Sequence, residues 1–360
     1  MRKIIYTLYA LLLANYVQGQ AWIEKIELST YIESYYNYDF NQPKSNEIPG
    51  FLYNFNRHNE VNLNIGFIQA SYISDEVRAN LALMTGTYAN VNLADEPDVM
   101  KNIFRANAGV KLTKNHQLWL DAGIFDSHIG FESAIGANNL TLSRSIMAEN
   151  SPYYLAGVKL SYTSSNKLWD FSLSYLNGWQ RIQRVEGNSS PAFGHQITYQ
   201  PNKQWSFNSS SFVGNDFPDE FKKNRYFHNF YTIYQPNMHW KFIFGLDSGW
   251  QQKEKGSSQY SNWFSPNLIA QYQLNEKSKL AGRVEYFDDQ DNVIIASDLV
   301  NNFGFQVSSY SLTFDYQITS LILWRIEARH FLGNNELFQQ NNELVKDSFF
   351  ITSSLAIKLY

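Results

Sequence analysis

The sequence predicts an all-β protein, an antiparallel transmembrane β-barrel of about 16 strands within a range of 14–18. Two observations carry this prediction: apolar and polar residues alternate along many short segments, and the connections between the segments are alternately short and long. In the segment 237–251, Trp240 and Phe244 fall on one face of a strand, and Lys241 and Asp247 fall on the other. Repeated along a whole chain, this pattern is typical of strands with lipid on one side and water on the other.

Sixteen segments show this alternation, and together they account for most of the chain. They cover residues 25–39, 58–73, 77–89, 103–113, 117–126, 153–162, 168–177, 192–200, 204–213, 225–234, 238–250, 261–274, 279–288, 304–317, 321–330 and 347–360.

Seven short connections, rich in Asn, Pro, Ser and Asp, alternate with eight long ones. The long connections lie near 40–57, 90–102, 127–152, 178–191, 214–224, 251–260, 289–303 and 331–346. Outer-membrane barrels combine short periplasmic turns with long external loops, so we expect that sidedness here. The even number of strands then returns both termini to the periplasmic side.

Charged residues stay on the face opposite the apolar row, which predicts that they point into the lumen. The predicted lumen-facing set is Arg78, Arg105, Lys111, Asp121, Lys159, Asp170, Lys241, Asp247, Arg283, Glu285, Arg325, Glu327 and Arg329. A soluble β-sandwich would show the same alternation with inside and outside exchanged. The N-terminal signal, the strand length and the asymmetry of the connections favour the barrel.

The first 19 residues predict a secretory signal peptide, with a basic start and an apolar stretch too short to span a bilayer. Residues 20–360 then form one barrel domain in the outer membrane of a Gram-negative bacterium. No apolar run long enough for a transmembrane helix follows the signal, which excludes a helical membrane protein. The final residue, Tyr360, suits the aromatic end by which barrels are generally recognised for assembly.

Composition agrees with a barrel and excludes other classes. The 24 Tyr, 26 Phe and 9 Trp can supply the aromatic girdles at the two membrane interfaces. The absence of Cys excludes a lipoprotein anchor, disulfides and thiol chemistry. With 29 basic and 33 acidic residues, the chain has no basic patch for nucleic acid.

The longest connection, Ser127–Ser151, follows the fifth predicted strand. Gly123-Ile124-Phe125 leads into Ser127-His128-Ile129-Gly130-Phe131-Glu132, and Ser143-Arg144-Ser145 precedes Pro152-Tyr153-Tyr154, with Gly157 and Lys159 after it. In these sequence motifs, and in its order of strands and connections from about residue 30 to the end, the chain resembles the OmpL-like β-barrel porins of Bacteroidetes, also called β-barrel porin-2. The resemblance implies an outer-membrane barrel of porin type, and the family offers no catalytic residues to carry over.

In general porins a long third loop folds back into the lumen, and Ser127–Ser151 is long enough to do so. The candidate constriction residues are Asp126, His128, Glu132, Arg144 and Glu149. Acidic and basic groups at a constriction set up a transverse field that orients solutes and determines ion preference. Alternatively, the same groups tie the loop to itself or to the wall through ion pairs, and both roles can coexist.

The remaining groups of polar residues give little indication of metal binding or catalysis. The seven His show no metal-binding spacing. His239, Asp247 and Ser248 invite comparison with membrane phospholipases, but His239 points to the lumen and no matching lipid-side Ser is evident. The acidic run Asp288–Asn292 could bind Ca²⁺, although a solvated acidic loop explains it more simply. We therefore expect no enzyme activity, no metal and no cofactor.

The expected function is passive diffusion of small polar solutes or ions through a water-filled barrel, with 127–151 as the candidate constriction. The alternative is a closed or plugged barrel that acts as a surface-binding or structural protein. Expected partners are outer-membrane lipid and lipopolysaccharide, the barrel-assembly machinery and small polar solutes, with a homo-oligomer as a further option. Single-channel conductance distinguishes the two functions.

Overall fold

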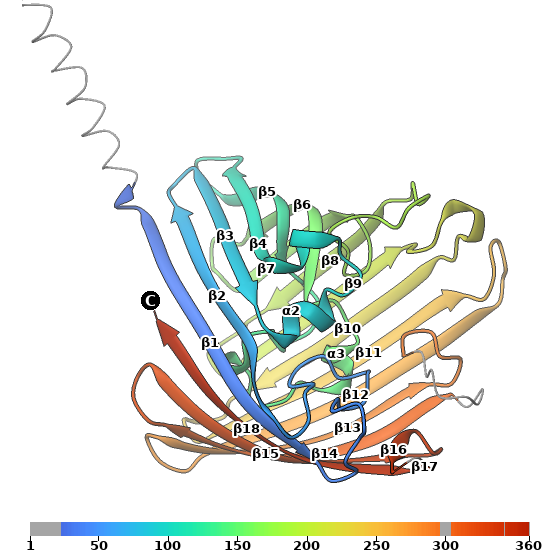
Figure 1. Ribbon diagram of the computed structural model, residues 1–360. Helices are drawn as coiled ribbons and strands as arrows, with labels where there is room; N and C mark the ends of the chain where they lie inside the picture. The colour runs from blue at the N-terminus through green and yellow to red at the C-terminus, as the bar shows by residue number, and fades with distance from the viewer. Residues whose placement is uncertain (1–22, 296–303, 342, 360) are drawn as a thin grey trace, which may run out of the picture.

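The strands close into a single antiparallel barrel in the computed structural model, which describes residues 23–295, 304–341 and 343–359 (Figure 1). The barrel contains sixteen strands in the order β1-β18-β15-β14 and onward to β2, so each strand pairs with its neighbours in sequence except at the closure. The predicted signal peptide, residues 1–19, and Tyr360 lie outside the described residues. Within the described ranges, no helix is long and apolar enough to cross a membrane.

The strand bounds follow the predicted ranges closely. They are β1 Ile26–Asp39, β2 Val61–Ile73, β3 Val77–Thr85, β4 Ile103–Lys111, β5 Gln117–Asp126, β6 Tyr154–Thr163, β7 Trp169–Leu176, β8 Ala192–Tyr199, β9 Trp205–Gly214, β10 Arg225–Tyr234, β11 Trp240–Gln252, β12 Tyr260–Gln273, β13 Ser278–Asp289, β14 Phe305–Gln317, β15 Ile322–Gly333 and β18 Asp347–Leu359. A small hairpin, β16 Phe338–Gln340 and β17 Glu343–Val345, lies in the last long connection. The short helices are α2 Thr87–Asn92, η1 Asp98–Asn102, η2 Gly136–Asn138, α3 Ile146–Glu149 and η3 Asp219–Phe221.

The predicted alternation is confirmed. On β11, Trp240 is 40%, Phe244 is 41% and Leu246 is 37% exposed, whereas Ile243 is 5% and Asp247 is 3% exposed. At the short-turn end, aromatic rings stack in pairs along the outside of the wall. The Trp169–Tyr199 and Trp205–Tyr234 ring centroids are each 4.1 Å apart. This is the girdle that a membrane barrel places at the lipid–water boundary.

Two local predictions are wrong around the second long connection. The strand predicted over 77–89 ends at Thr85, and the chain then forms α2. Strict alternation with Ala106 and Ala108 of the same predicted strand places Phe104 on the lipid face, but Phe104 is only 7% exposed and stacks on Phe67 with centroids 4.7 Å apart. The register of β3 and β4 shifts between Ala82 and Leu83, which leaves Phe104 as an extra residue in a β-bulge. A bulge reverses the facing that strict alternation predicts.

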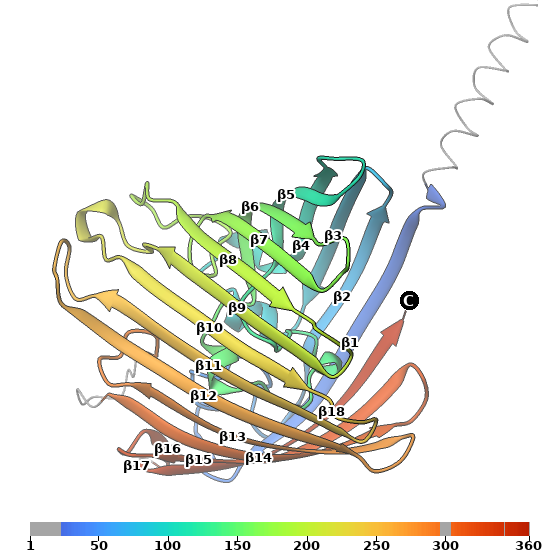
Figure 2. The same ribbon diagram turned by 180° about the vertical axis from the view of Figure 1, so that it is seen from behind.

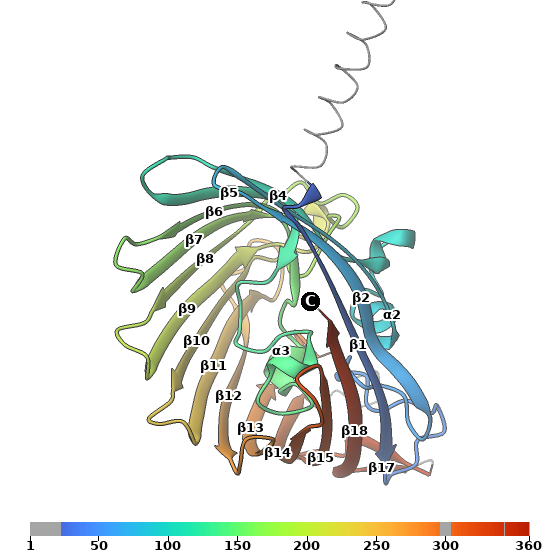
Figure 3. The same cartoon turned by 90° about the vertical axis from the view of Figure 1, so that its left-hand side faces the viewer.

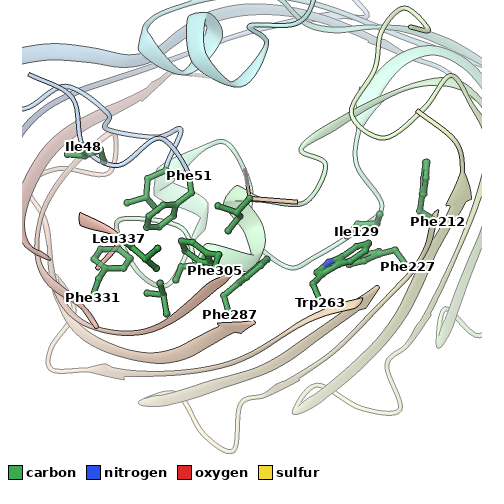
Figure 4. Packing of buried hydrophobic residues seen from close by; sticks show 14 of the residues in the cluster. Ile48, Phe51, Ile129, Phe212, Phe227, Trp263, Phe287, Phe305, Phe331 and Leu337 are labelled. Carbon is green, nitrogen blue, oxygen red and sulfur yellow. The ribbon is translucent and has the colours of Figure 1, made fainter. Parts of the chain in front are cut away.

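Inside the barrel, apolar side chains gather beneath the long connections. Figure 4 shows Phe51 beside Phe305, Phe331 and Leu337, and the ring centroids of Phe51 and Phe305 are 4.8 Å apart. Phe51 belongs to the first long connection, whereas Phe305 and Phe331 belong to β14 and β15. Packing of this kind holds a long connection against the inner wall instead of leaving it in solvent.

Candidate functional site

The connection 127–151, here called the inner loop, lies within the barrel, where Figure 3 shows its helix α3. Three arginines of the wall donate to its carbonyl groups. Arg325 on β15 reaches Gly136 O at 2.8 Å and Asn139 O at 3.1 Å. Arg283 on β13 reaches Ser143 O at 2.7 Å, and Arg329 on β15 reaches Arg144 O at 2.9 Å. These bonds fix the path of the loop across the lumen.

Each of these arginines is also neutralised by a carboxylate of the wall. Arg325 Nε lies 2.7 Å from Asp315, and Arg329 Nη2 lies 2.6 Å from Glu285. Arg283 lies 3.2 Å from Glu285, and all three guanidinium groups are almost completely buried. A buried charge is tolerated only when it is paired and hydrogen-bonded, and the wall carboxylates together with the loop carbonyls meet that requirement for the three arginines.

The wall also satisfies N–H groups of the loop. Glu285 accepts the N–H of Ile146, the first residue of α3, at 2.7 Å, and Ser145 caps that helix through Ala148 N at 3.2 Å. A carboxylate and a serine hydroxyl are the groups that a helix N-terminus prefers. Further along, Asn229 Oδ1 accepts the N–H of Gly130 at 3.2 Å.

Glycines of the wall make room for two side chains of the loop. A Cβ atom at Gly194 on β8 would lie 2.6 Å from the ring of His128. One at Gly245 on β11 would lie 2.5 Å from Cε1 of Phe131. Larger residues at these inward positions would occupy the space that the loop fills.

Three of the five candidate constriction residues have buried side chains that bond to the loop itself or to the first long connection. Arg144 is 0% exposed and donates to the carbonyls of Ser133, Ala134 and Leu142. Glu132 accepts the N–H of Ser145 at 3.0 Å. Glu149 accepts Tyr53 N at 3.0 Å, and its burial raises the pKa of its carboxyl. These groups hold the loop together.

The other two candidates differ from each other. His128 is 5% exposed, its Nε2 lies 2.8 Å from Ser211 O, and burial lowers its pKa to about 4, so the ring is neutral near pH 7. Asp126, at the end of β5, has a side chain that is 56% exposed and pairs with Arg105 at 2.6 Å. Asp126 is therefore the candidate that presents a charge to solvent.

The structure divides the predicted lumen-facing residues between opposite walls. Arg283, Glu285, Arg325, Glu327 and Arg329 come together beneath the inner loop. On the wall formed by β3–β6, Arg78 pairs with Asp121, and Lys159 lies 4.5 Å from the ring centroid of Phe125. The remainder are dispersed: Lys111 and Asp170 lie near the short turns, Lys241 lines a cavity there, and Asp247 is buried against Asn229.

That second wall carries a ladder of amides and hydroxyls beside its ion pairs, and its Phe104 and Ile124 share an apolar cluster with Ala134 and Ile135 of the inner loop. Gln69 Nε2 donates to Ser71 Oγ at 2.8 Å, Ser71 Oγ donates to Asn80 Oδ1 at 2.9 Å, and Asn80 Nδ2 donates to Asn107 Oδ1 at 3.1 Å. These residues are partly exposed, and the Arg78 side chain is 31% exposed. Such a surface is hydrophilic across β2–β4.

Two cavities lie at opposite ends of the loop. A cavity of about 630 Å³ at the short-turn end is lined by Ala137–Leu140 of the loop together with Lys241 and Lys279. A second, of about 330 Å³ at the long-loop end, is lined by Glu149–Ser151 together with Arg225. The inner loop therefore borders both cavities.

Sequence reasoning missed several residues that dock the loop. Tyr31 Oη accepts the N–H of Ala137 at 3.1 Å, and Gln196 Nε2 donates to His128 O at 3.0 Å. Tyr88 of α2 also packs in the apolar cluster that contains Ile135 and Ala148 of the loop. The available signal was position alone, because Tyr31 and Gln196 are uncharged residues at inward positions of their strands.

In the acidic run at the end of β13, the carboxylate of Asp289 bonds to the backbone of the residues that follow it. Asp289 accepts the N–H groups of Val293 and Ile294, each at 2.8 Å. Among the residues that the structure describes, no three His, Asp or Glu side chains are grouped closely enough to hold a metal ion.

A closed sixteen-stranded barrel with an apolar outer face and a long loop folded into a polar lumen is a barrel of the porin type in the outer membrane. The family model described as "Putative beta-barrel porin-2, OmpL-like" matches residues 25–359, and the chain belongs to this family. No curated protein matches the sequence.

Solved porins share the fold at very low sequence identity. The anion-selective porin of Comamonas acidovorans is 8% identical with a TM-score of 0.61, over 93% of this chain and 99% of that one. OmpT of Vibrio cholerae is 8% identical with a TM-score of 0.59, over 92% and 97%. The channel DcaP of Acinetobacter baumannii is 12% identical with a TM-score of 0.58, over 93% and 97%.

Proposed function

We propose that this protein is a diffusion porin, through which small polar solutes or ions cross the outer membrane passively, and that the inner loop narrows its channel. The observation that carries the proposal is the docking of the loop by Arg283, Arg325 and Arg329, with a cavity at each end of it. A loop held by buried, paired charges keeps a constant cross-section, which a size-selective channel requires.

We propose that solutes pass between the inner loop and the wall formed by β2–β6. Most of the loop's hydrogen bonds to the wall lie on the other side, on β8–β15 and at β1, and they leave β2–β4 its partly exposed polar ladder. The charges that solutes meet there are the pairs Arg78–Asp121 and Arg105–Asp126, together with Lys159. Ion preference then depends on these groups more than on Arg144, which is enclosed within the loop.

Conductance in a planar lipid bilayer tests the proposal. Purified protein should give discrete current steps, and deleting Ile135–Thr141 should increase their size, because that segment carries the carbonyls that Arg325 holds. Deleting Glu254–Gly256 is the matched control, since these exposed residues lie in another long connection, and it should leave the step size close to that of the parent protein.

The rival function is a plugged barrel that binds partners at the cell surface. The apolar cluster under the long connections, which includes Phe51 and Phe305, favours it because it fills part of the lumen. A parent protein that gives no current, together with a loop-deleted variant that does, would establish the plugged barrel and overturn the porin.

We further propose the sidedness and surroundings that this function needs. The short turns face the periplasm, the long loops face outward, and the apolar wall contacts outer-membrane lipid and lipopolysaccharide after insertion by the barrel-assembly machinery. The exposed apolar residues and the aromatic girdle support this arrangement. OmpT has also been solved in a trimer form, and we propose that this chain self-associates too, without carrying over the number of copies.

A further inference from the structure

A polar cluster interrupts the lipid-facing surface of β8–β11, the wall that faces the viewer in Figure 2. It consists of His195 on β8, Ser209 and Ser211 on β9, His228 on β10 and Ser248 on β11, here called the histidine–serine patch. The strand register places these residues side by side, because His195 and His228 both lie opposite Ser211, and Ser248 lies opposite His228.

The neighbours of the patch in sequence show that it points outward. Gln196 and Ser210 both donate to the carbonyl of His128 inside the barrel, at 3.0 Å and 2.7 Å. Asn229 bonds the inner loop at Gly130. Side chains alternate along a strand, so His195, Ser209, Ser211 and His228 must project to the other side. Flanking residues confirm this facing, since Phe193 is 52% and Val213 is 41% exposed.

The patch lies within the band that lipid should cover. On β10, His228 is one outward position inside Tyr226, and on β9, Ser209 lies two outward positions from Trp205. Apolar residues surround it, including Leu173, Phe230 and Leu246. Acyl chains offer no hydrogen bonds, so polar groups at this depth are normally turned toward protein or water.

The hydrogen bonds within the patch leave it incompletely satisfied. Ser211 Oγ and His195 Nδ1 are 2.5 Å apart, which is a close contact. The links from Ser209 Oγ to His195 Nε2 and to His228 Nε2 are both 3.4 Å, and His228 is exposed. Polar side chains can hydrogen-bond to one another across a protein interface within a membrane and so help to join the segments that carry them.

We propose that the histidine–serine patch is the contact surface for a second copy of this chain, related by a two-fold axis along the membrane normal. Histidine and serine each donate and accept hydrogen bonds, so two identical patches complement each other when a two-fold axis brings them face to face. A three-fold arrangement would instead set the patch against a different part of the next copy, where the outer wall is apolar.

Cysteine crosslinking tests this surface, and the chain has no native Cys to interfere. Ser211→Cys and His228→Cys lie close to the proposed axis. In outer-membrane fractions, each variant should shift to a crosslinked dimer upon oxidation or with a short bis-maleimide. The matched control is Ser34→Cys, which lies outward on β1 beside the 42% exposed Leu355 and should remain a monomer.

A steric variant provides the second arm. Ser211→Trp should abolish the dimer while the barrel keeps the heat-modifiable migration of a folded protein, and Ser34→Trp should keep the dimer. The proposal is overturned if Ser211→Cys and Ser34→Cys crosslink equally, or if Ser211→Trp leaves the dimer intact. Release of fatty acid from phospholipid vesicles that is lost in Ser211→Ala would also overturn it, by assigning the Ser211–His195 pair to ester hydrolysis.

Discussion

Charged residues of the lumen fall into two groups that differ in exposure. Arg144, Arg283 and Arg325 are completely or almost completely buried and act through the geometry of the inner loop. Arg105 and Asp126 are partly open to solvent, and in the proposed channel they would act through their field. Exposure, rather than charge alone, decides which residues a solute meets.

Arg105→Glu should therefore shift ion preference toward cations. The substitution removes a positive charge from the β4 wall and leaves Asp126 unneutralised. The reversal potential across a bilayer with a KCl gradient measures the shift. Arg57→Glu, in the first long connection and paired with Glu47 and Glu60, is the control. Equal shifts for the two variants would remove the β4 wall from the pathway.

Single substitutions on β11 can test which side chains point to lipid and which point into the lumen. Phe244→Arg places a charge against lipid and should cost about 2–4 kcal/mol of barrel stability. Lys241→Ala, on the inward face of the same strand, should cost much less. The stability of both variants can be measured by unfolding them and following the loss of the folded form, which migrates differently from the heated protein on gels. Comparable losses would contradict the assignment of inside and outside.

At the scale of elements, much of the structure follows from the sequence because strand facing is a local property. The apolar row of β11 and the short turns each depend on a few adjacent residues, and their positions are confirmed. The bulge at Phe104 is a different matter, because an extra residue in one strand becomes visible only when its partner β3 is known.

The inner loop shows where sequence reasoning ends. Its length and its mixed charges predict a return into the lumen, but they do not reveal that Arg144 bonds carbonyls of its own loop while Arg325 supplies the anchor. Burial depends on contacts between distant parts of the chain. The lipid-facing pair His195 and Ser211 was overlooked for the same reason, since the two residues meet only across strands.

Docking of the inner loop depends on the absence of a side chain at Gly245. Gly245→Val should displace Phe131, since even a Cβ atom would lie 2.5 Å from its ring, and the loop should then pack less closely. We expect larger and noisier single-channel currents from a barrel that still folds. Gly282→Ala is the control, because a Cβ there lies 3.9 Å from Ser311 O, its nearest neighbour. Unchanged currents in Gly245→Val would show that this contact does not hold the loop.

At the scale of the whole molecule, the two ends of the barrel differ, because one end carries the short turns and the other carries the long connections. Cysteines at Ser165, in a short turn, and at Asn334, in a long connection, should react differently with an impermeant maleimide on intact cells. Only Asn334→Cys should be labelled if the long loops face outward. Labelling of Ser165→Cys alone would reverse the orientation.

The closure of β1 on β18 has a consequence for assembly. Ten residue pairs, from Thr30↔Leu359 to Asp39↔Phe350, join the first strand to the last, so this seam can form only when both are present. The inner loop meets the seam from within, because Ala137 bonds Tyr31 and Glu33 lies against Gly136. Lys358 of β18 donates to Asn138 Oδ1 of the loop at 3.3 Å, so the loop contacts both strands of the seam. We therefore expect that entry of the loop into the lumen and closure of the seam are coupled during assembly.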